Sequence, residues 1–154
     1  MPLDMYRDTS FTSSSDTSRL ATLLSLEHAA DLTIIAMARL ISDGLPPSVL
    51  KGLDEKLHDI VSVKDIVPET TLRRVIKAKS KLSPDYSERL YDLCRVIDTV
   101  ALVYKGDNDE MRQFLTMPHP LLEGEKPLDL ARLNSAGADI VIDLLHGADA
   151  GVAL

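Results

Sequence analysis

Residues 114–130 read FLTMPHPLLEGEKPLDL, and this stretch says more about the fold than any other part of the chain. Pro118 and Pro120 disfavour helix at the residues before them and hold the segment extended. Gly124 permits a turn, and Pro127 suits the first position of a new helix. We therefore expect a short helix that ends, an extended link and a second helix, which is more typical of a docking platform than of a reaction centre.

The composition is that of a globular protein. The chain has 154 residues, of which 45% are hydrophobic and 27% charged, enough for one ordinary domain or two small ones that share a core. No apolar run approaches the roughly 20 residues of a membrane span. The serine- and acid-rich N-terminus has no apolar secretory segment, and the one cysteine, Cys94, has no partner for an internal disulfide. We expect a cytoplasmic protein that does not bind membranes.

The apolar pattern predicts an all-α protein of many helices. Apolar residues recur at spacings of three and four through most of the chain, and no segment alternates as a strand and hairpin would. Residues 1–18 are rich in Ser, Thr and Asp and lack this period, which predicts a flexible tail. We expect an N-terminal helical domain over residues 19–82 and a C-terminal helical domain over residues 83–154.

Capping residues place several helix ends. Ser83 followed by Pro84 predicts the start of a long helix, and Asp107 with Glu110 has the spacing of a capping box. Gly44 predicts a helix end. We also expect one helix to start with Ser25 as its N-cap and another with Thr70 or Thr71. The last helix is expected to end at Gly147.

The charge is distributed unevenly. The formal net charge is −7, which alone disfavours a general nucleic-acid binder, but residues 64–81 carry +4 and the remainder carries −11. Such a basic segment is either a solvated helix face or a surface that meets phosphate.

Within the basic segment, one short helix resembles the start of a helix-turn-helix recognition helix. Leu72, Val75 and Ile76 would anchor it to its neighbours. Its candidate DNA contacts, to phosphate or to base edges, are Thr71, Arg73, Arg74 and Lys77. The signal is weak by itself, because basic amphipathic helices are frequent.

The sequence offers no plausible catalytic set. Its histidines are His28, His58, His119 and His146, with no metal-ligand pair and no second cysteine. Cys94 falls near the apolar stripe of the long helix, where a core role is far more common than a nucleophile. His119, between two prolines, is either a turn residue with a local hydrogen bond or an interface contact. We expect no catalytic residue, metal or cofactor.

The apolar residues around the proline pair have two interpretations. They close this protein's own core, or part of the set stays accessible as a partner surface with a polar rim of Glu123, Glu125, Lys126 and Asp129. The candidate binding residues are Phe114, Leu115, Pro118, His119, Pro120, Leu121, Leu122, Pro127 and Leu128.

The order of several motifs resembles the antitoxins of the MbcA/ParS/Xre type. The resemblance covers roughly residues 44–147 and includes GLPPSVL at 44–50, VPETTLRR at 67–74, LSPDYSERL at 82–90, PHPLL at 118–122 and PLDLA at 127–131. No single motif is decisive, whereas their shared order is fairly specific.

The resemblance implies a type II antitoxin rather than an enzyme. Members of this family pair with RES-domain toxins, which consume NAD or use it for ADP-ribosylation. The C-terminal domain would bind the toxin and cover its NAD pocket, and an Xre-like, helix-turn-helix-related middle would bind the operon's promoter, usually as a homodimer. The competing hypothesis is an Xre-type repressor whose main role is promoter control.

Overall fold

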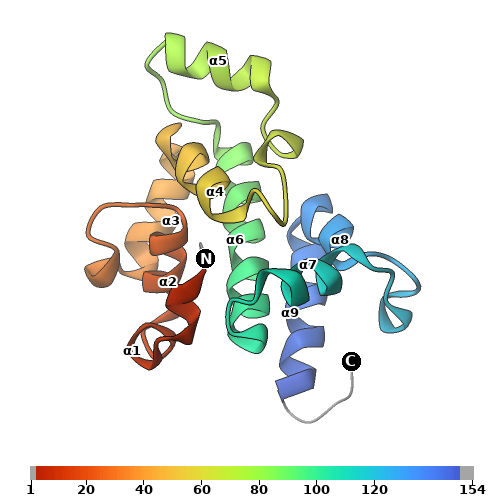
Figure 1. Ribbon diagram of the computed structural model, residues 1–154. Helices are drawn as coiled ribbons and strands as arrows, with labels where there is room; N and C mark the ends of the chain where they lie inside the picture. Colours follow the sequence, from red (N-terminus) through yellow and green to blue (C-terminus); the bar gives the residue numbers. More distant parts are fainter. Residues whose placement is uncertain (1–2, 150–154) are drawn as a thin grey trace.

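The structure, a computed structural model, describes residues 3–149, all of whose regular elements are helical, as predicted (Figure 1). The α-helices are α1 (Thr9–Thr12), α2 (Asp16–Leu23), α3 (Ile34–Asp43), α4 (Ser48–Leu57), α5 (Glu69–Lys77), α6 (Pro84–Tyr104), α7 (Asn108–Thr116), α8 (Pro127–Leu133) and α9 (Ser135–Asp149). Single 3-10 turns lie at η1 (Asp4–Arg7), η2 (Ala29–Asp31), η3 (Val63–Asp65) and η4 (Pro120–Leu122).

The long helix α6 is the centre of the fold. It starts as predicted, because the Ser83 side chain accepts a hydrogen bond from the Tyr86 amide and Pro84 occupies the first turn. Helices α2, α3, α7, α8 and α9 all contact α6. Burial of a Leu or Ile side chain contributes about 1.5–3 kcal/mol. The stripe formed by Leu90, Leu93 and Ile97, fully buried, therefore supplies much of the stability.

One hydrophobic core runs from Leu3 to Leu145. It crosses the expected domain boundary between residues 82 and 83, because α6 packs against α2 and α3 as well as against α7, α8 and α9. The predicted division into two domains therefore describes two halves that share one core. Residues 1, 2 and 150–154 of the predicted segments lie outside the described residues.

Residues 3–18 differ from the expected flexible tail, because they are folded against α6. Leu3 and Tyr6 are buried in the core. Gly106, just after α6, has φ +73°, and a Cβ there would lie 2.2 Å from the Leu3 carbonyl oxygen. Two apolar side chains and a polar network fix this segment to α6, rather than a periodic apolar stripe. Rules based on the spacing of apolar residues therefore do not detect it.

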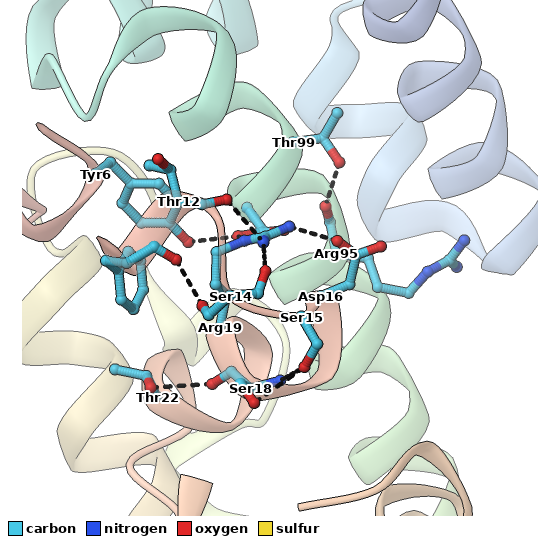
Figure 2. A network of polar contacts seen from close by, with 12 residues as sticks. Tyr6, Thr12, Ser14, Ser15, Asp16, Ser18, Arg19, Thr22, Arg95 and Thr99 are labelled. Carbon is cyan, nitrogen blue, oxygen red and sulfur yellow. Dashed lines mark hydrogen bonds and ion pairs between the residues drawn. The ribbon is translucent and has the colours of Figure 1, made fainter. Parts of the chain in front are cut away.

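That polar network connects the N-terminal segment to α6 (Figure 2). The Tyr6 hydroxyl donates to Oδ1 of Asp98 (2.7 Å), and Arg19 donates from Nε to the same oxygen (3.0 Å) and from Nη2 to Oδ2 (3.2 Å). Arg19 also donates to the carbonyls of Thr12 and Ser14 and pairs with Asp16. Burial, followed by the Asp98 charge, raises the pKa of the Tyr6 phenol, so the hydroxyl stays a donor at neutral pH.

Three predicted helix ends are wrong. Ser25 follows α2 with φ 54°, and the cap of α3 is Thr33, whose hydroxyl accepts from the Ala36 amide (3.1 Å). Thr70 and Thr71 lie inside α5, which begins at Glu69. Helix α9 continues past Gly147 to Asp149, since a glycine ends a helix only where the backbone turns left-handed. The expected ends at Gly44 and Asp107 are confirmed.

Candidate functional site

The segment between α7 and α8, residues 117–126, is here named the elbow; it projects away from the helical body (Figure 1). Met117 and His119 are extended, as the following prolines require. Glu123 and Gly124 then have φ of 56° and 81°, which reverses the chain. The predicted order of helix, extended link and helix is confirmed, with one additional 3-10 turn at Pro120–Leu122.

His119 is the centre of the elbow's hydrogen bonding. Its amide donates to the Glu125 carbonyl, and its own carbonyl accepts from the amides of Leu122 and Gly124, each at 3.0 Å. Its Nδ1 accepts from the Leu121 amide (3.1 Å), which places the ring proton on Nε2. The local hydrogen bond expected of His119 is present, the interface role stays a prediction, and these bonds restrict the conformation of the elbow.

Ring contacts connect the elbow to the end of α6. The Phe114 ring lies with its centroid 6.0 Å from that of Tyr104 and 6.1 Å from that of His119, the latter edge to face. Contacts of this kind stabilise by about 0.5–1.5 kcal/mol beyond area burial. The half-buried Phe114, on α7, therefore connects His119 of the elbow to Tyr104 at the end of α6.

The structure divides the nine predicted binding residues by burial. Leu115, Leu122 and Leu128 are buried, at no more than 6% exposure, and Pro127 is buried beside them. Pro118, Pro120 and Leu121 are exposed, and Leu121 keeps 59% of its surface accessible. The buried residues anchor the platform, and the exposed ones form its outer surface.

Met117 belongs to this outer surface, although sequence reasoning omitted it. Its side chain is 53% exposed directly before Pro118. Its position at the end of α7, followed by a proline that forces it out of the helix, was the available signal. The predicted polar rim, Glu123, Glu125, Lys126 and Asp129, is exposed around the elbow.

Helix α8, which follows the elbow, packs between η3 on one side and α9 on the other. Arg132 donates to Asp129 on its own helix (2.9 Å) and to Asp65 in η3 (3.1 Å). On the other side, α9 approaches so closely that a Cβ at Gly137 would lie 2.0 Å from the Leu130 carbonyl oxygen. Glycine is therefore required at this crossing, and it fixes α8 at the base of the elbow.

The predicted DNA contacts lie on α5, apart from the elbow. Figure 1 shows α5 at the edge of the molecule, joined to α4 through the turn η3 and to α6 by a short loop. Arg73, Arg74 and Lys77 are exposed and Thr71 is half-buried. Arg73 pairs with Glu69 at 3.1 Å, and Val75 is the residue of α5 that is buried.

Cys94 is fully buried in α6, and burial raises the pKa of its thiol. The thiol therefore stays protonated at neutral pH. Among the described residues, no three His, Cys, Asp or Glu side chains are grouped in a way that would hold a metal ion.

We predict that Cys94 does not react with a thiol reagent such as dithionitrobenzoate at pH 8 while the protein is folded. One equivalent should react at once in 6 M guanidinium. Fast reaction of the native protein would show that α6 opens readily.

The elbow is thus a hydrogen-bonded, projecting loop that exposes apolar side chains within a rim of charged ones, an arrangement typical of a protein-binding surface. Residues 99–151 match the family described as the antitoxin Xre/MbcA/ParS C-terminal toxin-binding domain. The match covers about a third of the chain and includes the elbow and all nine predicted residues, so the resemblance is confirmed for residues 99–151. The resemblance over residues 44–98 stays a prediction.

None of the curated proteins compared with the chain matches it. Over the residues that the structure describes, we find no helix with the length and apolar character needed to cross a bilayer.

Proposed function

We propose that this protein is the antitoxin of a type II toxin-antitoxin pair. Its elbow binds a RES-domain toxin and covers that toxin's NAD-binding active site, and the chain performs no reaction itself. The toxin is one that consumes NAD or uses it for ADP-ribosylation. The observation that carries the proposal is that the family match to a toxin-binding domain contains the elbow, where Leu121 and Met117 are exposed on a hydrogen-bonded, proline-stiffened loop.

Occlusion requires shape and burial rather than chemistry. A loop held by its own hydrogen bonds loses little conformational freedom on binding, so less of the contact energy is spent on ordering the loop. Leu121 and Met117 are 59% and 53% exposed, so covering the rest of each side chain contributes about 1–2 kcal/mol. The exposed acids Glu123 and Glu125 add a charged rim, which favours the correct orientation of the partner.

Co-purification tests this proposal. The tagged chain is co-expressed with the product of the neighbouring reading frame and isolated at 0.5 M salt. A stable complex that contains a RES-domain protein supports the proposal, and isolation of the chain alone from cells that make both proteins would contradict it.

A second function, control of the operon's promoter, is favoured by one observation. The basic side chains Arg73, Arg74 and Lys77 are all exposed on a helix that projects from the body. A homodimer in the cytoplasm would present two such helices to adjacent turns of DNA. The same chain would then both neutralise the toxin and repress its own synthesis.

We predict that Arg73→Ala with Arg74→Ala weakens binding to the upstream DNA. The slope of log affinity against log salt should fall by about 1 for each lost phosphate contact. Mobility shifts over a salt series measure this slope. The matched control, Arg7→Ala with Arg39→Ala, also removes two exposed charges and should leave the slope unchanged. Equal slopes for the parent and the α5 variant would contradict DNA contact by α5.

A further inference from the structure

Two shallow hollows lie beside α5, and both include Pro47 and Ile76. The larger, of about 430 Å³, lies between α4 and α5 and has a mostly apolar lining that includes Leu50, Val63 and Leu72. The smaller, of about 380 Å³, is formed with residues 79–81. We name the two together the α5 groove.

The apolar face of α5 is only partly covered by the protein itself. Leu72 is half-buried, and Ile76 lies between the two hollows with 57% of its surface exposed. At 100° per residue, Leu72, Val75 and Ile76 occupy one side of the helix, whereas Arg73, Arg74 and Lys77 occupy the other. If the basic side chains Arg73, Arg74 and Lys77 contact DNA, the groove on the opposite side of α5 therefore stays accessible to a second partner.

The edge of the groove is basic. Lys51 and Lys64 line the larger hollow, and Lys79 and Lys81 line the smaller. Within residues 3–149, none of these four ammonium groups has an ion pair or hydrogen bond to the protein, whereas Arg19, Arg95 and Arg132 each pair with an acid. Among the residues that the structure describes, Asp54 is the one acid that lines the groove.

These features together select the kind of occupant. A nucleic acid would neutralise the lysines but offers little apolar surface to cover Leu50, Leu72 and Ile76. An amphipathic helix with acids on its flanks satisfies both requirements, since its apolar stripe fills the hollows and its carboxylates meet the lysines. We propose that the α5 groove binds an acidic amphipathic helix of a partner protein. This inference does not depend on the toxin-binding proposal.

The length of the groove limits the length of the bound segment. Helix α5 has nine residues and therefore extends about 14 Å at 1.5 Å per residue. A partner segment of about three turns, with apolar residues at positions i, i+4 and i+7, matches this length. Its acids should lie on both sides of the apolar stripe, because lysines border both hollows.

The test uses the full chain and two designed, fluorescently labelled 14-residue helical peptides. Both carry the same leucine stripe, with glutamates on the flanks of one and lysines on the other, and binding is followed by anisotropy at several salt concentrations. We expect the acidic peptide to bind, with an affinity that falls as salt rises, and the basic peptide to bind at least 10-fold more weakly. Equal binding of the two peptides, or binding of neither, would overturn the proposal.

Single substitutions locate the binding surface. Ile76→Glu should weaken binding of the acidic peptide at least 10-fold, whereas Ile35→Glu, at a similarly exposed position on α3 (64%), should leave it unchanged. Equal affinity of the Ile76→Glu variant and the parent would place the peptide elsewhere and overturn the proposal. The proposal would also be overturned if a DNA duplex displaced the peptide and the Ile76→Glu variant no longer bound that duplex. The groove would then be a nucleic-acid surface.

Discussion

Replacement of Asp98 by alanine is expected to lower the free energy of unfolding by about 3–5 kcal/mol, the usual consequence of removing one partner of a buried ion pair. Arg19 and Asp98 are each only 4% exposed. Without the carboxylate, the buried Arg19 guanidinium keeps only the exposed Asp16 as its counter-charge, and the Tyr6 hydroxyl loses its acceptor. Urea unfolding followed by circular dichroism measures the change.

The matched control is Asp85→Ala on the same helix. It removes an exposed pair with Arg89 (3.5 Å) and should change the free energy of unfolding by less than about 1 kcal/mol. Limited proteolysis supplies a second measure, because release of residues 3–18 from α6 should expose their peptide bonds. If Asp98→Ala and Asp85→Ala unfold at the same urea concentration, the network does not hold the N-terminal segment in place.

Replacement of Leu121 by aspartate is expected to raise the Kd for the toxin by at least about 100-fold while the fold stays intact. The substitution removes an apolar contact of about 1–2 kcal/mol, because 59% of the Leu121 surface is left for the partner to cover, and it places a charge where the partner excludes water. Because Leu121 is 59% exposed in the free protein, the same charge is tolerated there. Calorimetric titration with the toxin gives the Kd, and circular dichroism verifies the helical content.

Ile35→Asp is the control, since this exposed isoleucine lies on α3, outside residues 99–151. It should leave the Kd unchanged. Leu122→Asp is unsuitable for this purpose, because Leu122 is 6% exposed and its substitution would disturb the support of the elbow. A Kd for Leu121→Asp within threefold of the parent value would show that the elbow is not the docking surface.

Local chemistry accounts for what the sequence predicted correctly. Pro118 and Pro120 act on their immediate neighbours, and Ser83 with Pro84 defines a helix start within four residues. The elbow, the start of α6 and the cap of α7 therefore follow from short-range rules.

Long-range contacts account for what the sequence could not show. Leu121 and Leu122 are adjacent and chemically alike, yet one is exposed and the other buried, because the turn at Pro120–Leu122 directs only one of them inward. Tyr6 meets Asp98 across 92 positions, and no local pattern announces that pairing. The spacing of apolar residues predicts which segments form helices, but it does not predict which helices pack against each other.

The most direct test of the central claim is NAD turnover by the purified toxin with increasing amounts of this protein. We predict that NAD loss stops near the stoichiometry of the complex, that the Leu121→Asp variant fails to stop it, and that the chain alone consumes no NAD. Undiminished NAD loss in the presence of a stable excess of the chain would contradict the claim that this protein covers the toxin's active site.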